Sequence, residues 1–389
     1  MRTLLFIDPN FSMQSPSLKS VLREWPHGFD DFDRVEVWAI RSDFQNDRIH
    51  TDFVWCPVKT WNLVSIWYWF AIHLRYFWRF IVLRQPRPTV IQSTNYYCYG
   101  ADLIYLHFSH LAYGRVIRQH QGRLALSLMR KVIFWIHYAQ EWLLFKAAKP
   151  RWWWVVSRQL GQECEADAGG GNFRVLPNSY DEARFNPTVR SEHREPMRRQ
   201  LELGPDEVVF AFVSLGALER KGFDLAAGAV AKLNSDGCPA KLLMIGGATA
   251  EPENIAPFLR DHGIASHDFI VQVGRVPDIE RYLSAADALL FPSYCEAFAL
   301  VEIEAAALGL RLYLTPHYGS EMILREPGNG RLLPWTAEGI AAVLAEDIGS
   351  GAVRNSNGAM GEALDRNGFL DETRRRYREI LADKESAVV

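Results

Sequence analysis

Two glutamates, Glu296 and Glu304, stand eight residues apart where an apolar run meets an amphipathic segment. The run 288–291 is expected to be a buried strand, and a helix is expected to open near residue 299. The N-terminus of a helix presents free N–H groups to an anion, and carboxylates accept hydrogen bonds from hydroxyl groups. The spacing therefore fits a nucleotide-sugar diphosphate, with phosphates on the helix N-terminus and hydroxyls on the carboxylates. The alternative is an amphipathic helix that carries solvated glutamates.

Strand and helix patterns alternate along the whole chain, which predicts parallel sheets covered by helices on both faces. The pattern restarts after a polar link at 187–203, so we expect two doubly wound α/β domains with a cleft between them, and ligands at the carboxyl ends of the strands. The expected strands are 4–7, 34–40, 89–93, 103–107, 152–157, 173–176, 208–214, 241–245, 269–273, 288–291 and 311–315, and the clearest helices are 62–84, 130–149 and 225–233.

The expected helix 62–84 has an apolar stripe that predicts packing against a sheet. A second interpretation is a helix that faces a membrane, with Arg75, Arg79 and Arg84 near lipid headgroups. Packing against a sheet leaves the aromatic residues on the polar side unexplained. The stripe consists of Leu63, Trp67, Phe70, Leu74, Trp78 and Ile81, and the other aromatics are Tyr68, Trp69, Tyr76 and Phe80.

Charge is distributed unevenly over the 389 residues. The net charge is −3, which does not suggest a nucleic-acid-binding protein. However, segment 53–162 holds 14 Lys/Arg against two acids, and it holds ten of the 13 tryptophans. This basic, Trp-rich segment 53–162 predicts contact with an anionic and partly apolar partner, such as lipid headgroups or a lipid-linked acceptor. The alternative is a solvated basic face over a Trp-containing core.

The five cysteines are dispersed and form no CxxC pair, which favours a reducing compartment and disfavours a structural metal site. The first residues are expected to be a strand and not a signal peptide. No apolar run reaches the length needed to span a bilayer. Asp31 and Asp33 resemble a DxD metal motif, but they precede a strand, so metal binding is disfavoured. We expect a cytoplasmic chain, or one located peripherally on the inner face of the plasma membrane.

Glu296 and Glu304 also match the E-x7-E motif of the family-four retaining glycosyltransferases, which have the GT-B fold. Leu300, Val301 and Gly309 fit the usual pattern around that motif. Other segments resemble further parts of the family: 214–222 is similar to its Lys-Gly phosphate-binding segment, and 241–247, 274–276 and 282–287 are similar to its later strands and base-binding loop. Segments 155–157 and 174–181 resemble its junction between domains, so the likeness covers about 85–330.

The resemblance implies an acceptor-binding Rossmann-like domain at 1–182, a donor-binding Rossmann-like domain at 183–368, and a C-terminal helix at 369–389 that returns to the first domain. It implies retaining transfer of a sugar from a UDP- or GDP-sugar, such as GDP-mannose, to a glycan or lipid-linked acceptor in cell-surface polysaccharide, lipopolysaccharide or glycolipid synthesis. No essential metal or cofactor is expected. The alternatives are a sugar-nucleotide epimerase of the same fold and an inactive nucleotide-sugar-binding member.

Site residues are carried over position by position. Arg220 and Lys221 would neutralise the leaving diphosphate, Glu296 would orient the donor sugar, and His107 at a strand end would contact that sugar. Ala217, Ala297 and Ala299 replace residues common in the family, and the loop 9–15 lacks its usual glycines. The other donor-side candidates are Glu304, Phe298, Ala299, Leu300, Gly274, Arg275, Val276 and Gly216, and the acceptor-side candidates are Asn10, Ser15 and His110.

Overall fold

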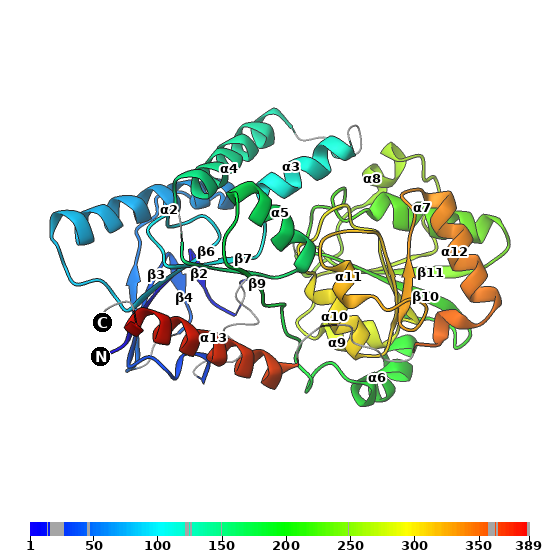
Figure 1. The fold of residues 1–389 in the computed structure, drawn as a ribbon. Coiled ribbons are helices and arrows are strands. Elements are labelled where there is room, and N and C mark those ends of the chain that lie inside the picture. Colours follow the sequence, from blue (N-terminus) through cyan, green and yellow to red (C-terminus); the bar gives the residue numbers. More distant parts are fainter. Residues whose placement is uncertain are drawn as a thin grey trace. The chain divides into compact units, whose positions relative to one another are not determined.

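The computed structural model describes residues 1–13, 15, 27–44, 47–120, 124, 127–148, 150–247, 249–356, 362 and 365–386. The chain forms two compact units (Figure 1). Unit 1 comprises Met1–Asn178 together with Arg366–Val389, and unit 2 comprises Ser179–Asp365. Each unit has its own parallel sheet, as the alternating strand and helix patterns predicted.

Unit 1 contains a seven-stranded parallel sheet in the order β5-β3-β1-β6-β7-β8-β9. Its central strands are buried, as expected for a sheet covered on both faces. The strands are β1 (Thr3–Ile7), β3 (Arg34–Ala39), β5 (Ile49–Phe53), β6 (Val90–Thr94), β7 (Leu103–Leu106), β8 (Trp152–Val155) and β9 (Phe173–Val175), and a short pair is formed by β2 (Asn10–Phe11) and β4 (Arg41–Ser42).

Helices cover both faces of this sheet (Figure 1). One face is covered by α2 (Trp61–Tyr76), which continues as a π-helical segment (Phe77–Val82), and by α4 (Leu128–Ala147). The opposite face is covered by α13 (Arg366–Ser386), whose Tyr377 ring packs 5.2 Å from Phe32 and 5.1 Å from Trp154. The predicted return of the C-terminal helix to the first domain is therefore confirmed. Unit 1 also contains η1 (His27–Phe29), α3 (His110–Gln119) and α5 (Arg158–Ala168).

The predicted packing of helix 62–84 is wrong. Tyr68 and Phe80 face the sheet, where the Tyr68 hydroxyl donates to the carbonyl of Trp38 and the Phe80 ring stacks on Trp38 at 6.2 Å. The apolar stripe that contains Phe70 and Trp78 is exposed instead. Because large apolar or aromatic side chains lie on both sides of the helix, its stripe does not identify the buried side. The contacts of Tyr68 and Phe80 with Trp38 determine which side of the helix faces the sheet.

Unit 2 contains a six-stranded parallel sheet in the order β12-β11-β10-β13-β14-β15. The chain runs outward from β10 in one direction and from β13 in the other, so the loops that follow β10 and β13 meet at the switch point of the topology, where such sheets bind ligands. The strands are β10 (Val208–Ser214), β11 (Ala240–Gly246), β12 (Ile270–Val273), β13 (Ala288–Phe291), β14 (Arg311–Leu314) and β15 (Gly330–Leu332). The helices are α7 (Phe223–Ser235), α8 (Ala256–Asp261), α9 (Ile279–Ser284), α10 (Leu300–Ala307), α11 (Ser320–Ile323), α12 (Ala337–Gly349) and η3 (Ala352–Arg354).

The segment expected to be a polar link, 187–203, forms helix α6 (Pro187–Gln200) for most of its length, so this expectation is wrong. Asn186 caps the helix by accepting from the N–H of Val189 at 3.0 Å. Arginines spaced four residues apart then anchor one face: Arg194 pairs with Asp287 at 2.6 Å, and Arg190 and Arg198 donate to carbonyl oxygens. Hydrogen bonds from cations replace the usual apolar stripe, so hydrophobic periodicity could not reveal the helix.

Candidate functional site

The loops that follow β10 and β13 are held together by backbone contacts. Gly222 adopts φ 71°, and a Cβ at this position would lie 2.1 Å from the carbonyl oxygen of Pro292. The N–H of Tyr294 donates to the carbonyl of Arg220 at 2.9 Å, and the Ser293 hydroxyl donates to the same carbonyl at 3.2 Å. Only glycine allows both the left-handed backbone and this close approach.

This junction places three predicted site residues in contact. Arg220 Nη1 lies 2.9 Å from Glu296 Oε1, and Lys221 Nζ lies 3.2 Å from the same oxygen. The three side chains are between 15% and 26% exposed. Lys221 Nζ also lies 4.6 Å from the centre of the Phe291 ring. One carboxylate thus sits between two cations in a site that is mostly shielded from water.

The environment of Glu296 keeps its carboxylate ionised. Burial raises the pKa of Glu296, but the positive charges of Lys221, Arg220 and His317 outweigh that effect and lower the pKa to about 2. A carboxylate with so low a pKa accepts hydrogen bonds well and accepts protons poorly. The site therefore suits the orientation of hydroxyl groups better than proton abstraction.

Helix α10 begins directly after the Glu296 loop. Ala299 is its N-cap, and among the residues that the structure describes no side chain caps the helix, so the first N–H groups stay available to an anion. Phe298, Ala299 and Glu304 are buried and Leu300 is half-buried. The expected start of the helix near residue 299, with Glu304 inside it, is confirmed.

A buried pair beside this site was missed by the sequence analysis. Glu302 on α10 and His317, which follows β14, lie 2.9 Å apart with both side chains fully buried. Burial lowers the pKa of His317, but the Glu302 charge, hydrogen bonds with Glu302 and the Tyr318 backbone, and the Glu296 charge together outweigh burial, so the net effect raises the pKa. Burial raises the pKa of Glu302 more than the His317 charge lowers it. A histidine shortly after a buried strand was the available signal, because strand ends of this sheet line the site.

The remaining donor-side candidates lie in loops at the same edge of the unit 2 sheet. A Cβ on Gly274 would lie 1.8 Å from the carbonyl oxygen of Ala250, and the N–H of Arg275 donates to Thr249 at 2.7 Å. Arg275 is exposed and Val276 is half-buried. Gly216 follows β10 with φ 117°, and its N–H donates to the Ser214 hydroxyl at 3.2 Å. Because all these strands are parallel, their carboxyl ends bring these loops to one edge.

The first-domain candidates lie in unit 1. His107 follows β7 with its ring 4.0 Å from that of Tyr105, and burial lowers its pKa to about 3. His110 opens α3, and burial together with the His137 charge lowers its pKa to about 3. Both rings are therefore neutral at pH 7. The N–H of Asn10 donates to Asp8 at 2.7 Å, and Ser15 is buried with its N–H on the carbonyl of Ser12 at 3.0 Å.

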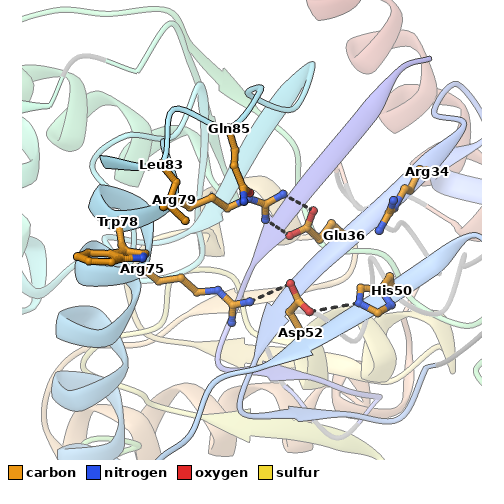
Figure 2. A pocket seen from close by; sticks show the side chains of 9 residues that line it. All are labelled: Arg34, Glu36, His50, Asp52, Arg75, Trp78, Arg79, Leu83 and Gln85. Atoms are coloured by element: carbon orange, nitrogen blue, oxygen red, sulfur yellow. Dashed lines mark hydrogen bonds and ion pairs between the residues drawn. The ribbon is translucent and has the colours of Figure 1, made fainter. Parts of the chain in front are cut away.

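A cavity of about 400 Å³ opens elsewhere in unit 1, between strands β3 and β5 and the end of α2 (Figure 2). None of the predicted site residues lines it. Two of its three arginines pair with its two acids: Arg79 pairs with Glu36, and Arg75 pairs with Asp52 at 2.8 Å. The cavity is lined by Arg34, Glu36, His50, Asp52, Arg75, Trp78, Arg79, Leu83 and Gln85.

The aspartates of the DxD-like segment make ion pairs and hydrogen bonds within unit 1. Asp31 pairs with Arg378 of α13 at 3.1 Å, and Asp33 accepts from the N–H of Arg2 at 2.6 Å. Across the described residues, no three His, Cys, Asp or Glu side chains are grouped to hold a metal ion. The same part of the chain contains no helix both long and apolar enough to cross a membrane.

Comparison with known proteins places the site in a family. The sequence model of the family described as "Glycosyl transferases group 1" matches residues 208–348, which contain Arg220, Lys221, Glu296 and Glu304. Residues 208–348 are a glycosyl transferases group 1 domain. This group 1 domain lies entirely within unit 2.

Curated relatives resemble the same half of the chain. D-inositol 3-phosphate glycosyltransferase of Mycobacterium ulcerans is 30% identical over 183 residues, which cover 46% of this chain and 37% of the relative. The enzyme of the same name from Jonesia denitrificans is 28% identical over 190 residues, which cover 47% of this chain and 44% of the relative. The matched region thus spans less than half the length of these relatives.

Solved structures resemble the chain over nearly its whole length. WaaG, a glycosyltransferase involved in lipopolysaccharide biosynthesis, has a TM-score of 0.66 at 17% identity, covering 99% of this chain and 98% of WaaG. Sucrose-phosphate synthase from Thermosynechococcus elongatus has a TM-score of 0.70 at 16% identity, with 98% and 100% covered. HepE of Anabaena in complex with UDP-glucose has a TM-score of 0.65 at 16% identity, with 98% and 100% covered. The predicted GT-B fold is therefore confirmed.

Proposed function

We propose that this chain is a retaining glycosyltransferase that transfers a sugar from a nucleotide diphosphate donor to a glycan or lipid-linked acceptor. The observation that carries the proposal is the contact of Arg220, Lys221 and Glu296 at the switch point of the group 1 domain, beside an uncapped helix N-terminus. Cations and free N–H groups bind phosphates, and carboxylates bind sugar hydroxyls. The site offers both within one loop junction.

The donor diphosphate would take over the two cations that Glu296 now shares. As the glycosidic bond breaks, negative charge develops on the departing phosphate, and Arg220, Lys221 and the α10 N–H groups would stabilise it. One such contact contributes about 2–4 kcal/mol to transition-state stabilisation. Glu304 would accept hydrogen bonds from the ribose hydroxyls, and Gly274, Arg275 and Val276 would hold the base.

The chemistry of Glu296 supports transfer without a protein base. Its pKa of about 2 makes the carboxylate a weak proton acceptor, so we propose that it orients donor-sugar hydroxyls. The acceptor hydroxyl would attack on the face from which the diphosphate departs, and its proton would pass to the departing phosphate oxygen. His107, neutral at pH 7, would hydrogen-bond the donor sugar. The chain would need neither a metal nor a cofactor, because its own cations neutralise the diphosphate.

The comparisons guide the choice of substrates. The UDP-glucose complex of HepE supports a UDP-sugar as the first donor to test, with GDP-sugars such as GDP-mannose next. The role of WaaG in lipopolysaccharide biosynthesis supports a glycolipid or cell-surface polysaccharide as the product class. Such an acceptor would bring this chain to the cytoplasmic surface of a membrane.

Donor binding and slow donor hydrolysis across UDP-, GDP- and ADP-sugars test this proposal. Glu304→Ala should weaken donor binding and slow the release of nucleoside diphosphate. Glu338→Ala is the matched control, because Glu338 is an exposed glutamate in the first turn of another unit 2 helix. The proposal fails if the wild type binds no donor, or if both variants behave alike.

A further inference from the structure

Helix α2 and its π-helical extension expose large apolar side chains on the side that faces away from the sheet. Eight of them are between 42% and 57% exposed. Single exposed apolar residues are normal, but a continuous stripe of this length marks an interaction surface. The stripe consists of Leu63, Phe70, Leu74, Phe77, Trp78, Ile81, Val82 and Leu83.

Helix α4 shows the same feature. Its buried side contains His137, Gln140, Glu141, Leu144 and Phe145, and its outward side is apolar. Seven outward side chains are between 38% and 80% exposed. They are Leu128, Met129, Val132, Trp135, Ile136, Trp142 and Leu143.

The two stripes belong to one layer of unit 1. Helices α2 and α4 cover the same face of the sheet, opposite α13 (Figure 1). Ser65 on α2 lies 3.2 Å from the His137 ring on α4, and the Tyr99 hydroxyl donates to the carbonyl of Gln140. We call the two exposed stripes together the apolar face. Trp78 and Leu83 belong to this face and also line the cavity of Figure 2, so the cavity lies at its edge.

The two helices that form the apolar face carry mostly basic charge. Residues 61–84 contain no acid, and 128–147 contain only Glu141, which is fully buried. Exposed cations accompany the apolar side chains: Arg84 beside the π-helical end, and Arg130, Lys131 and Lys146 on α4. The apolar face therefore combines Trp and aliphatic side chains with positive charge and presents no acid of its own helices.

We propose that the apolar face binds the surface of an anionic lipid bilayer, with its apolar side chains below the headgroups and its cations on the lipid phosphates. Tryptophan suits the boundary between headgroups and acyl chains, and long basic side chains reach the phosphates while their stems stay in the apolar layer. A second copy of the chain fits poorly, because a two-fold interface would set the same cations against each other. This inference goes beyond the proposed transfer reaction and does not depend on it.

Vesicle flotation with the full chain tests the inference. The chain should float with vesicles of phosphatidylcholine and phosphatidylglycerol, bind phosphatidylcholine vesicles more weakly, and lose binding as salt is raised. The double variant Trp78→Glu/Trp135→Glu removes one apolar anchor from each helix and should weaken binding about a hundredfold. The variant Lys131→Glu should weaken binding to anionic vesicles about 25-fold, because it removes one positive charge and adds one negative charge, each worth about a factor of five.

Leu332→Glu is the matched control, because Leu332 is an exposed leucine on β15 of unit 2. It should bind vesicles like the wild type. UDP and GDP binding is measured for every variant. A variant that binds neither nucleotide has a folding defect or contradicts the proposed function, whereas a variant that binds nucleotide as the wild type does tests this inference alone. The inference is overturned if the wild type does not float with anionic vesicles, if Leu332→Glu loses as much binding as the double variant, or if sedimentation shows a wild-type dimer that the double variant dissociates.

Discussion

Exchanging Glu296 for glutamine removes one negative charge from between two cations and leaves the shape of the side chain nearly unchanged. The ordinary glutamate pKa of 4.5 falls to about 2 at this position. At 1.36 kcal/mol per pKa unit, the folded state favours the ionised form by about 3 kcal/mol. The side chain is only 15% exposed, so solvent screening removes little of this interaction.

The depressed pKa fixes the direction of the pH dependence. A carboxylate whose pKa is lower in the folded state stabilises the fold above pH 4.5, and this contribution is lost as the pH falls toward about 2. Glu296→Gln should therefore lower the free energy of unfolding at pH 7 by about 1–3 kcal/mol, since the amide still accepts a hydrogen bond from Arg220. The variant should also lack this part of the wild-type loss of stability in acid.

Nucleotide binding and turnover should respond in opposite ways. Without the competing carboxylate, Arg220 and Lys221 are free for a diphosphate, so UDP or GDP should bind the variant at least as tightly as the wild type. Turnover should fall about a hundredfold or more, because the contact that orients the donor sugar is lost.

Urea unfolding followed by tryptophan fluorescence at several pH values, and calorimetric titration with UDP and GDP, measure these effects. Glu338→Gln, an exposed glutamate exchanged in the same unit, should leave both unchanged. If Glu296→Gln keeps the wild-type acid profile and binds UDP or GDP more weakly, Glu296 is not the charge partner of the two cations and the reasoning is refuted.

Three further predictions concern the same loops. Lys221→Met should weaken UDP or GDP binding about tenfold or more while leaving free nucleoside binding unchanged, which calorimetry can measure, and equal losses for both ligands would contradict the role in phosphate binding. The raised pKa of His317 predicts a contribution to stability that is present below its unfolded pKa of 6.5 and is lost as the pH rises through the higher folded pKa, so His317→Asn should flatten that loss. The same variant should lower the free energy of unfolding by about 3–5 kcal/mol, because it leaves Glu302 without its partner. Adding Glu302→Gln to the His317→Asn variant should restore part of the lost stability. Gly222→Ala should destabilise the chain by more than Gly237→Ala in urea unfolding, because both glycines have φ above 70° but only the first has a carbonyl oxygen 2.1 Å from the added Cβ; equal losses would show that the contact with Pro292 is unimportant.

Much of the fold and of the site in unit 2 could be predicted from local sequence. Strand β13 has its predicted limits and α10 opens where expected, because a short apolar run followed by an amphipathic segment is a strong local pattern. The contact of Arg220 and Lys221 with Glu296 follows from topology, since each segment comes directly after a strand of one parallel sheet. A parallel sheet brings consecutive carboxyl ends to one edge whatever the details of packing.

Other features depend on contacts between distant parts of the chain. Helix α6 is held by arginines that reach carbonyls and a carboxylate about ninety residues away, and no local pattern encodes those partners. The pair of Glu302 and His317 exists only because α10 and the loop after β14 pack together. Neither residue signals the other, and their pKa shifts arise from burial that the sequence does not display.

The orientation of α2 shows most clearly what local sequence cannot predict. The amino-acid sequence determined that residues 61–82 are helical and apolar, since both follow from composition and local propensity. Which side faces the sheet was decided by tertiary structure alone, where Tyr68 finds the carbonyl of Trp38 and Phe80 finds its ring. Both sides of this helix carry large apolar or aromatic side chains, so burial alone does not fix its rotation, and specific polar and aromatic partners determine it. The opposite side of α2 forms its stripe of the exposed apolar face.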